Sequence, residues 1–192
     1  AKLHKFLSGA APEIDYKAIQ HKPNIATRAA SADVLVALAQ QVENMIVSSA
    51  DLSNSDKTDG FIKGGARDLV KGDFSGAFLQ AGVAELTMAV ICNGIALHGG
   101  IHVACGTFFV FSDYFKGSVE RNISSRLADI LLENDISVKE IKTSINISDN
   151  GGISINEVKI AAENAAQGAE AVDIVKRETG EKTLVKIEEL TQ

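Results

Sequence analysis

Apolar side chains recur at helical spacing soon after Pro23. Residues 27–39 combine strong helix formers with one apolar face, which predicts a helix. The apolar run at residues 45–47 then predicts a short buried strand. Residues 51–71 are rich in Asp, Ser, Asn, Gly and Lys, and they predict a long polar loop of the kind that often carries function.

A second helix is predicted over residues 78–97, and the pair Gly99-Gly100 is expected to end it. The apolar positions that indicate a largely buried helix are Val83, Leu86, Met88, Val90, Ile91 and Ile95. Residues 102–111 are β-branched and aromatic, which predicts a buried strand. The order helix, strand, loop, helix, strand is typical of a three-layer α/β unit with a parallel sheet. Ligands bind such folds beyond the carboxyl ends of the strands, so we expect any site near residues 48–55 and after residue 111.

The pattern changes after about Ser118. Residues 123–132 have the spacing of an amphipathic helix, and alternating apolar positions on both sides of Asp149-Asn150-Gly151-Gly152 predict a β-hairpin. An Ala-rich helix over residues 161–178, ended by Gly180, and a last strand over residues 184–187 follow. We therefore predict an incomplete three-layer α/β parallel-sheet unit over residues 1–117 and a small α+β module (α-β-β-α-β) over residues 118–192.

Composition narrows the classes of partner. The 192 residues carry a net charge of −6, which offers no electrostatic basis for binding nucleic acid or an anionic membrane surface. Cys92 and Cys105 are too few and too far apart for a disulfide scaffold or a zinc site. Both lie in apolar stretches, where a free cysteine behaves as a small hydrophobic residue, and reduced thiols suit a cytoplasmic protein. The longest apolar stretch, near residues 89–110, is interrupted by polar side chains and predicts no membrane span. A chain that begins with Ala1 suggests processing, trimming or a fragment.

Three blocks of sequence, in order and with matching spacing, resemble the pyrimidine-binding domain of the transketolase family. The first is Ile25-Ala26-Thr27-Arg28-Ala29-Ala30-Ser31, and the second is Ser49-Ala50-Asp51-Leu52 with the residues that follow it. The third runs from Ala84-Glu85-Leu86 through Asn93-Gly94 and Leu97-His98-Gly99-Gly100 to Thr107-Phe108-Phe109-Val110-Phe111-Ser112-Asp113-Tyr114. Linked blocks are far more specific than one short motif, and together they cover about residues 10–117.

The resemblance implies a fold of the thiamine-diphosphate-binding type and a catalytic role for Glu85. The aminopyrimidine of that cofactor must act as an internal base, which needs a carboxyl group beside a ring nitrogen, and Glu85 occupies the family's position for it. Phe108, Phe111 and Tyr114 match the family's aromatic cradle around the pyrimidine. Flat rings suit stacking on a flat heterocycle, although packing in the core is the commoner role of strand aromatics.

The resemblance also implies contacts with substrate. Arg28 and Ser55 match the pair that grips the sugar phosphate, and Asp51 matches a position near the substrate channel. Arg suits phosphate because its planar fork binds two oxygens at once. The alternatives are a solvated Arg at a helix start, a turn Ser and an Asp that caps the loop. His98 matches the family and His102 departs from it, and we assign neither a role in proton transfer.

The implied activity is two-carbon ketol transfer between sugar phosphates, as in the pentose phosphate pathway. After Gly117 the resemblance ends, so a partner is expected: a diphosphate-binding domain or second subunit that holds the cofactor's Mg²⁺ or Ca²⁺, in a dimer or other homo- or hetero-oligomer. The isolated chain is expected to be inactive. The alternative is a structural or oligomerisation module, or a chimera, without catalytic activity, because residues 138–147 and 152–160 faintly resemble the ring-building domains of sporulation channel proteins.

Overall fold

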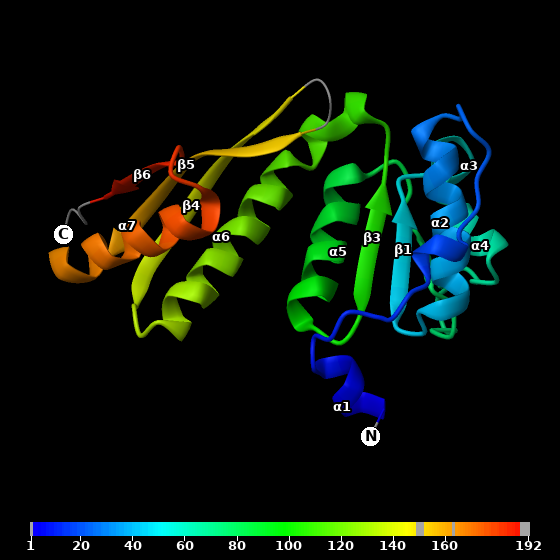
Figure 1. The fold of residues 1–192 in the computed structure, drawn as a ribbon, viewed down its shortest axis with the longest axis horizontal. Helices are drawn as coiled ribbons and strands as arrows, with labels where there is room; N and C mark the ends of the chain where they lie inside the picture. The colour runs from blue at the N-terminus through cyan, green and yellow to red at the C-terminus, as the bar shows by residue number, and fades with distance from the viewer. Residues whose placement is uncertain (1, 149–151, 163, 189–192) are drawn as a thin grey trace. The chain divides into compact units, whose positions relative to one another are not determined.

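The computed structural model in Figure 1 describes residues 2–148, 152–162 and 164–188. The chain divides between Phe115 and Lys116 into two compact units, each with its own sheet and core. The predicted turn residues Asp149, Asn150 and Gly151 lie outside the described residues.

A three-stranded parallel sheet with strand order β2-β1-β3 organises the first unit. The central strand β1 (Met45–Ser49) pairs with β2 (Phe78–Gln80) on one side and with β3 (His102–Gly106) on the other. Parallel strands are buried on both faces, and β1 is accordingly almost fully buried, including Ser48 and Ser49. The predicted parallel α/β fold is confirmed.

Helices cover the two faces of this sheet. On one face, α2 (Thr27–Gln41) and α4 (Gly60–Lys63) supply Leu35 and Phe61 to a core that contains Val47 and Phe78. On the other face, α5 (Glu85–His98) packs Met88 and Cys92 against Ala50 and Val103. The remaining short elements are α1 (Lys2–Leu7), α3 (Ser53–Asp56) and the 3-10 helices Tyr16–Ala18 and Phe109–Tyr114.

The prediction of one helix over residues 78–97 was wrong at its start. Phe78 is fully buried and pairs with Val47, so residues 78–80 form β2, and Gly82 adopts a positive φ of 69° before α5 begins at Glu85. Pairing in the sheet overrides the helical pattern here. The strand predicted over residues 102–111 likewise ends at Gly106, and the aromatic residues after it form a 3-10 helix.

The predicted polar loop over residues 51–71 also proved to be partly helical. It contains α3 and α4, and Phe61 of α4 is only 2% exposed. Gly60 allows the close packing, because a Cβ atom there would lie 2.5 Å from the carbonyl oxygen of Ala32 in α2. One apolar residue in a polar stretch therefore anchors this segment.

The predicted burial of α5 was wrong for four of the six apolar positions named for this helix. Met88 is buried, whereas Val83, Leu86, Val90 and Ile91 are exposed, with Val83 at 80%. A helix that packs on a sheet buries one stripe, and α5 is apolar on more than one face. We call the exposed set Val83, Leu86, Val90, Ile91 and Leu97 the α5 apolar surface.

The second unit matches the predicted order helix, hairpin, helix, strand. Its elements are α6 (Lys116–Glu133), β4 (Val138–Ile147), β5 (Ile153–Ala162), α7 (Ala165–Thr179) and β6 (Leu184–Ile187). β5 pairs antiparallel with β4 and parallel with β6, and the helices and sheet share one core that includes Leu131, Val158 and Val175. Two ion pairs lie on the sheet. Lys142 Nζ is 2.9 Å from Glu140 Oε2, and Lys159 Nζ is 3.1 Å from Glu188 Oε1.

The helix predicted from residue 161 begins later, at Ala165. Ala161 and Ala162 pair with β4 as the end of β5, which removes them from the helix. Asn164 then caps α7 by accepting a hydrogen bond from the backbone N–H of Gln167 at 3.0 Å. The predicted end at Gly180 is confirmed, since Gly180 has a positive φ of 101° and its N–H bonds back to Lys176.

We predict that Phe61→Ala destabilises the first unit by about 3–5 kcal/mol, the usual cost of truncating a buried aromatic side chain. Urea unfolding followed by circular dichroism measures the loss. Phe74→Ala is the matched control, because Phe74 is 81% exposed and its truncation should change stability little. Equal effects of the two substitutions would show that α4 does not anchor the loop.

Candidate functional site

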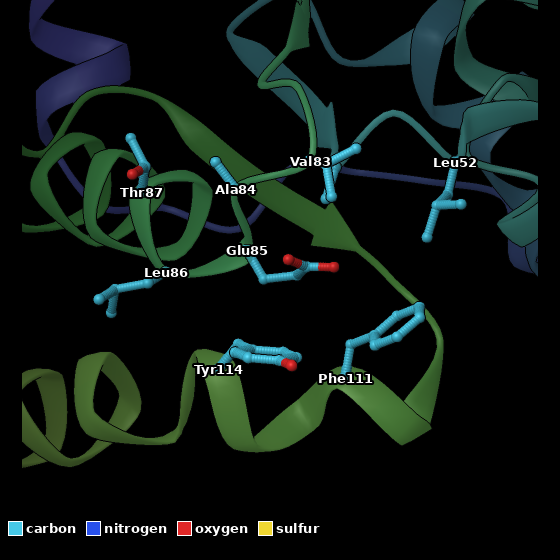
Figure 2. A pocket seen from close by; sticks show the side chains of 9 residues that line it. Leu52, Val83, Ala84, Glu85, Leu86, Thr87, Phe111 and Tyr114 are labelled. Atoms are coloured by element: carbon cyan, nitrogen blue, oxygen red, sulfur yellow. The ribbon is translucent and has the colours of Figure 1, made fainter.

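A cavity of about 440 Å³ lies beyond the carboxyl ends of β1 and β3 in the first unit (Figure 2). Segments after β1 and β3 and the start of α5 form its walls. The lining residues are Ala50, Leu52, Val83, Ala84, Glu85, Leu86, Thr87, Phe111 and Tyr114. A cavity at this edge of a parallel sheet is where ligands of such folds bind.

Glu85 is the one ionisable carboxylate among these lining residues. It is the first residue of α5, it is only 8% exposed, and Figure 2 shows its carboxylate directed into the cavity between Val83 and the two aromatic rings. The positive end of the helix dipole stabilises a carboxylate at this position. Thr107, just after β3, donates a hydrogen bond from Oγ1 to Glu85 Oε1 at 3.4 Å.

Two of the three predicted cradle aromatics reach this cavity. Phe111 and Tyr114 line it, with ring centroids 6.3 Å apart and ring planes inclined by 39°. Tyr114 is 63% exposed, so its face remains available for a flat ligand. Phe108 precedes the 3-10 helix Phe109–Tyr114 and does not line the cavity.

The residues predicted to contact substrate lie elsewhere. Arg28, in the first turn of α2, lines a separate cavity of about 340 Å³ together with Asp56, Thr58, Cys105 and Thr107. Ser55, in α3, is exposed and lines neither cavity. Asp51 is exposed between β1 and α3 and has a left-handed φ of 62°. The structure therefore does not bring Arg28 and Ser55 together in one cavity.

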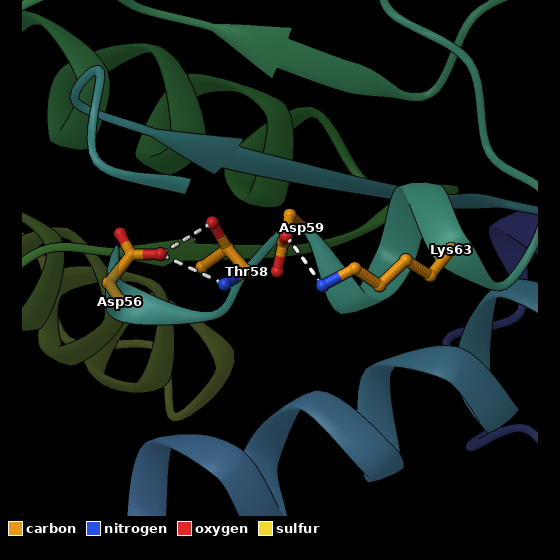
Figure 3. A network of polar contacts seen from close by, with 4 residues as sticks. All are labelled: Asp56, Thr58, Asp59 and Lys63. Carbon is orange, nitrogen blue, oxygen red and sulfur yellow. Dashed lines mark hydrogen bonds and ion pairs between the residues drawn. The ribbon is translucent and has the colours of Figure 1, made fainter. Parts of the chain in front are cut away.

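A network of hydrogen bonds orders the segment from Ser49 to Thr58, and it was not predicted from the sequence. Asp56 Oδ2 accepts a hydrogen bond from the Ser49 hydroxyl at 2.9 Å. Asp56 Oδ1 accepts from the backbone N–H and the hydroxyl of Thr58 at 2.9 and 2.8 Å (Figure 3). The Asp-x-Thr spacing is a turn signal that could have indicated it. In α4, Lys63 pairs with Asp59 at 2.7 Å across one helical turn.

The two histidines noted in the sequence stay outside the Glu85 cavity. His98 is exposed at the end of α5, with Nδ1 3.2 Å from the carbonyl oxygen of Gly99. His102 opens β3 and lines a third cavity beside residues 10–13.

Within the part of the chain that the structure describes, no three His, Cys, Asp or Glu side chains are grouped so that they could hold a metal ion. Over the same residues, no helix has the length and apolar character needed to cross a membrane.

Comparison with known proteins gives a consistent result for the first unit. Residues 23–131 match the family described as transketolase, pyrimidine binding domain. The chain is 45% identical over 96 residues to a transketolase of Bacillus subtilis, covering 50% of this chain and 14% of the relative. It is 38% identical over 122 residues to a transketolase of Geobacillus stearothermophilus, covering 62% of this chain and 18% of the relative.

Solved structures agree with these matches. The crystal structure of a Pichia stipitis transketolase in complex with sedoheptulose-7-phosphate aligns with a TM-score of 0.54 and 35% identity, over 62% of this chain and 19% of that one. The chain thus spans less than a fifth of the length of these relatives. The match extends past Gly117, where the resemblance read from the sequence ends, to residue 131. The likeness of residues 138–160 to ring-building domains has no support from these matches.

We predict that Gly106→Ala destabilises the segment between the cavities by about 1–3 kcal/mol, the range for overpacking. A Cβ atom at Gly106 would lie 2.5 Å from Thr58 Cγ2. Thermal unfolding measures the loss. Adding Thr58→Ser should restore most of the stability, because serine lacks Cγ2 and keeps the hydroxyl that bonds to Asp56. Failure of this rescue would contradict the close approach.

Proposed function

The chain belongs to the family of transketolase pyrimidine-binding domains, and on that premise we propose that the Glu85 cavity is the pyrimidine half of a thiamine-diphosphate site. The observation that carries the proposal is the placement of Glu85: one buried carboxylate at the start of α5, directed into a largely apolar cavity beside two aromatic rings. A heterocycle with a hydrogen-bonding edge and flat faces fits these surroundings.

The residues present suit this group. A Glu85 carboxylate oxygen would share a proton with a ring nitrogen, and a partner that covers the exposed Val83 and Leu86 side chains would keep water from the shared proton. Phe111 and Tyr114 would hold the ring by stacking, and we extend no such role to Phe108, which lies outside the cavity lining. When bound, thiamine diphosphate supplies an electron sink for carbanions.

Thr107 is a positioning residue for Glu85 in this proposal. The Thr107 hydroxyl donates a hydrogen bond to Glu85 Oε1 at 3.4 Å. Glu85 Oε2 is then the oxygen that would bind the ligand. Glu85 is also the first residue of α5, so its backbone is held in the first turn of that helix. The two effects fix the orientation of a side chain that must act at one atom of a ring.

We further propose that the complete assembly transfers a two-carbon ketol unit between sugar phosphates. The chain spans less than a fifth of the relatives' length, so the diphosphate and its divalent metal ion would be held by a partner domain or second subunit. Arg28 is the candidate for a substrate phosphate, since it lines a cavity at the carboxyl ends of β1 and β3. Ser55 and Asp51 remain weaker candidates because they line neither cavity.

The α5 apolar surface supports the expectation of a partner. Four of its five exposed apolar side chains project from the helix that carries Glu85, Val83 lies just before that helix, and exposed apolar surface of this kind marks an interface. We propose that the partner domain or second subunit covers it, in a homo- or hetero-oligomer. The family match gives no support to the alternative of an assembly module without a cofactor.

We predict that Glu85→Gln lowers cofactor activation by about 10²–10⁴-fold, the usual share of a general acid or base. The full chain is mixed with the diphosphate-binding domain of a homologous transketolase, thiamine diphosphate and Mg²⁺. Hydrogen–deuterium exchange at the reactive carbon of the cofactor, followed by nuclear magnetic resonance, reports activation. Calorimetry should still detect binding, because the aromatic walls are unchanged.

Glu13→Gln is the matched control, since Glu13 is exposed and lies outside the cavity. Unchanged exchange in Glu85→Gln would remove the catalytic assignment. Absence of heat in the parent chain, with and without the added domain, would overturn the cofactor site as a whole.

We predict that Val90→Glu weakens association with the partner domain at least about tenfold, because a charge would be buried in an apolar interface. Sedimentation velocity of the mixture, and of the chain alone, measures association. Val70→Glu is the control, because Val70 is similarly exposed, at 52% against 47% for Val90, and lies outside α5. Equal behaviour of the two variants would exclude the α5 apolar surface as the interface.

A further inference from the structure

The two cysteines lie on elements that face each other. Cys92 is buried in α5, in the cluster with Ala50 and Met88 that packs against Val103 of β3. Cys105 lies two residues after Val103 on β3, and side chains two positions apart in a strand project from the same face. Cys105 therefore stands on the face of β3 that α5 covers.

The two thiols differ in environment. The interaction with Cys105 raises the pKa of Cys92, and burial raises it further, while the same interaction lowers the pKa of Cys105 against the opposing effect of desolvation. Cys105 is also exposed, whereas Cys92 is 4% exposed.

Cys92 lies in apolar surroundings, as expected from the sequence, whereas Cys105 is exposed. An exposed thiol with a lowered pKa beside a second thiol is the arrangement of a reactive cysteine and its resolving partner. The sequence could not indicate it, because twelve residues separate the two positions and only the packing of α5 on β3 joins them.

We propose that Cys92 and Cys105 are a peroxide-sensitive pair that closes to an intrachain disulfide. The Cys105 thiolate attacks one oxygen of hydrogen peroxide, the O–O bond breaks, and the released hydroxide takes a proton to leave as water. Cys92 then attacks the sulfur of the resulting sulfenic acid, and its proton leaves with the hydroxyl as a second water. Two thiols are oxidised and one peroxide is reduced.

The disulfide would join α5, whose first residues line the Glu85 cavity, to β3. α5 begins with Glu85, and β3 leads into the segment that carries Phe111 and Tyr114. The proposal does not depend on the cofactor site, because the chemistry needs only the two thiols and a peroxide.

The test uses the full chain, which has two cysteines, so a disulfide within one monomer must join Cys92 and Cys105. The chain is treated with hydrogen peroxide, denatured, alkylated with iodoacetamide and weighed intact. We expect the loss of both alkylation sites in the monomer, reversed by dithiothreitol. The same oxidation should be slower in urea, where the fold no longer holds the thiols together.

Single substitutions assign the roles, after circular dichroism has shown that each variant is folded. Cys92→Ser should stop at a sulfenic acid on Cys105 that dimedone traps, and Cys105→Ser should leave Cys92 reduced. Three results would each overturn the proposal: both thiols still alkylated after peroxide, a disulfide between two chains as the main product, or equal oxidation in Cys105→Ser and the parent chain.

Discussion

The central position of β1 is the constraint on which the first unit depends. β1 pairs with both other strands, and its Met45 and Val47 side chains belong to the core on one face of the sheet. Val47 contacts the α2 and α4 side, while Ala50, just past the strand, contacts α5. Ser49 then bonds to Asp56, which fixes the turn that follows. One strand therefore positions both cavities, since each lies at its carboxyl end.

Burying a carboxylate opposes stability, and the fold offsets that cost around Glu85. An isolated charge in an apolar cavity is strongly unfavourable unless donors or dipoles replace water. The start of α5 supplies the dipole, and Thr107 supplies a hydroxyl. A site retained at this cost is more readily explained by chemistry than by packing, because an apolar residue would fill the same position with less strain.

The sequence predicted the classes and order of elements well wherever periodicity and local signals agreed. The helix from Thr27, the central strand and the hairpin with its flanking helices all depend on such local patterns. Phe78 and Phe61 were misassigned because their positions are set by pairing and packing with distant residues. The error at α5 has a different cause: hydropathy reports that a side chain avoids water, and it does not say whether the core or a partner covers it.

The candidate site was likewise predictable where a sequence motif identifies a residue, and not where packing between distant elements decides. The resemblance placed Glu85, Phe111 and Tyr114 correctly at one cavity, because linked motifs carry three-dimensional information that composition lacks. The resemblance could not indicate that Arg28 and Glu85 line different cavities, or that Cys92 and Cys105 lie on facing elements. Both relations arise from the way the helices pack on the sheet.

The helix α6 shows why a likeness in sequence and a physical boundary need not coincide. The family match ends at residue 131, inside α6, yet Leu127 and Leu131 of this helix pack with Val158 and Val175, which lie beyond the match. A boundary at residue 131 would divide that core, whereas the chain separates into its two compact units between Phe115 and Lys116. Residues 116–131 of α6 thus match the transketolase family in sequence and pack with the second unit.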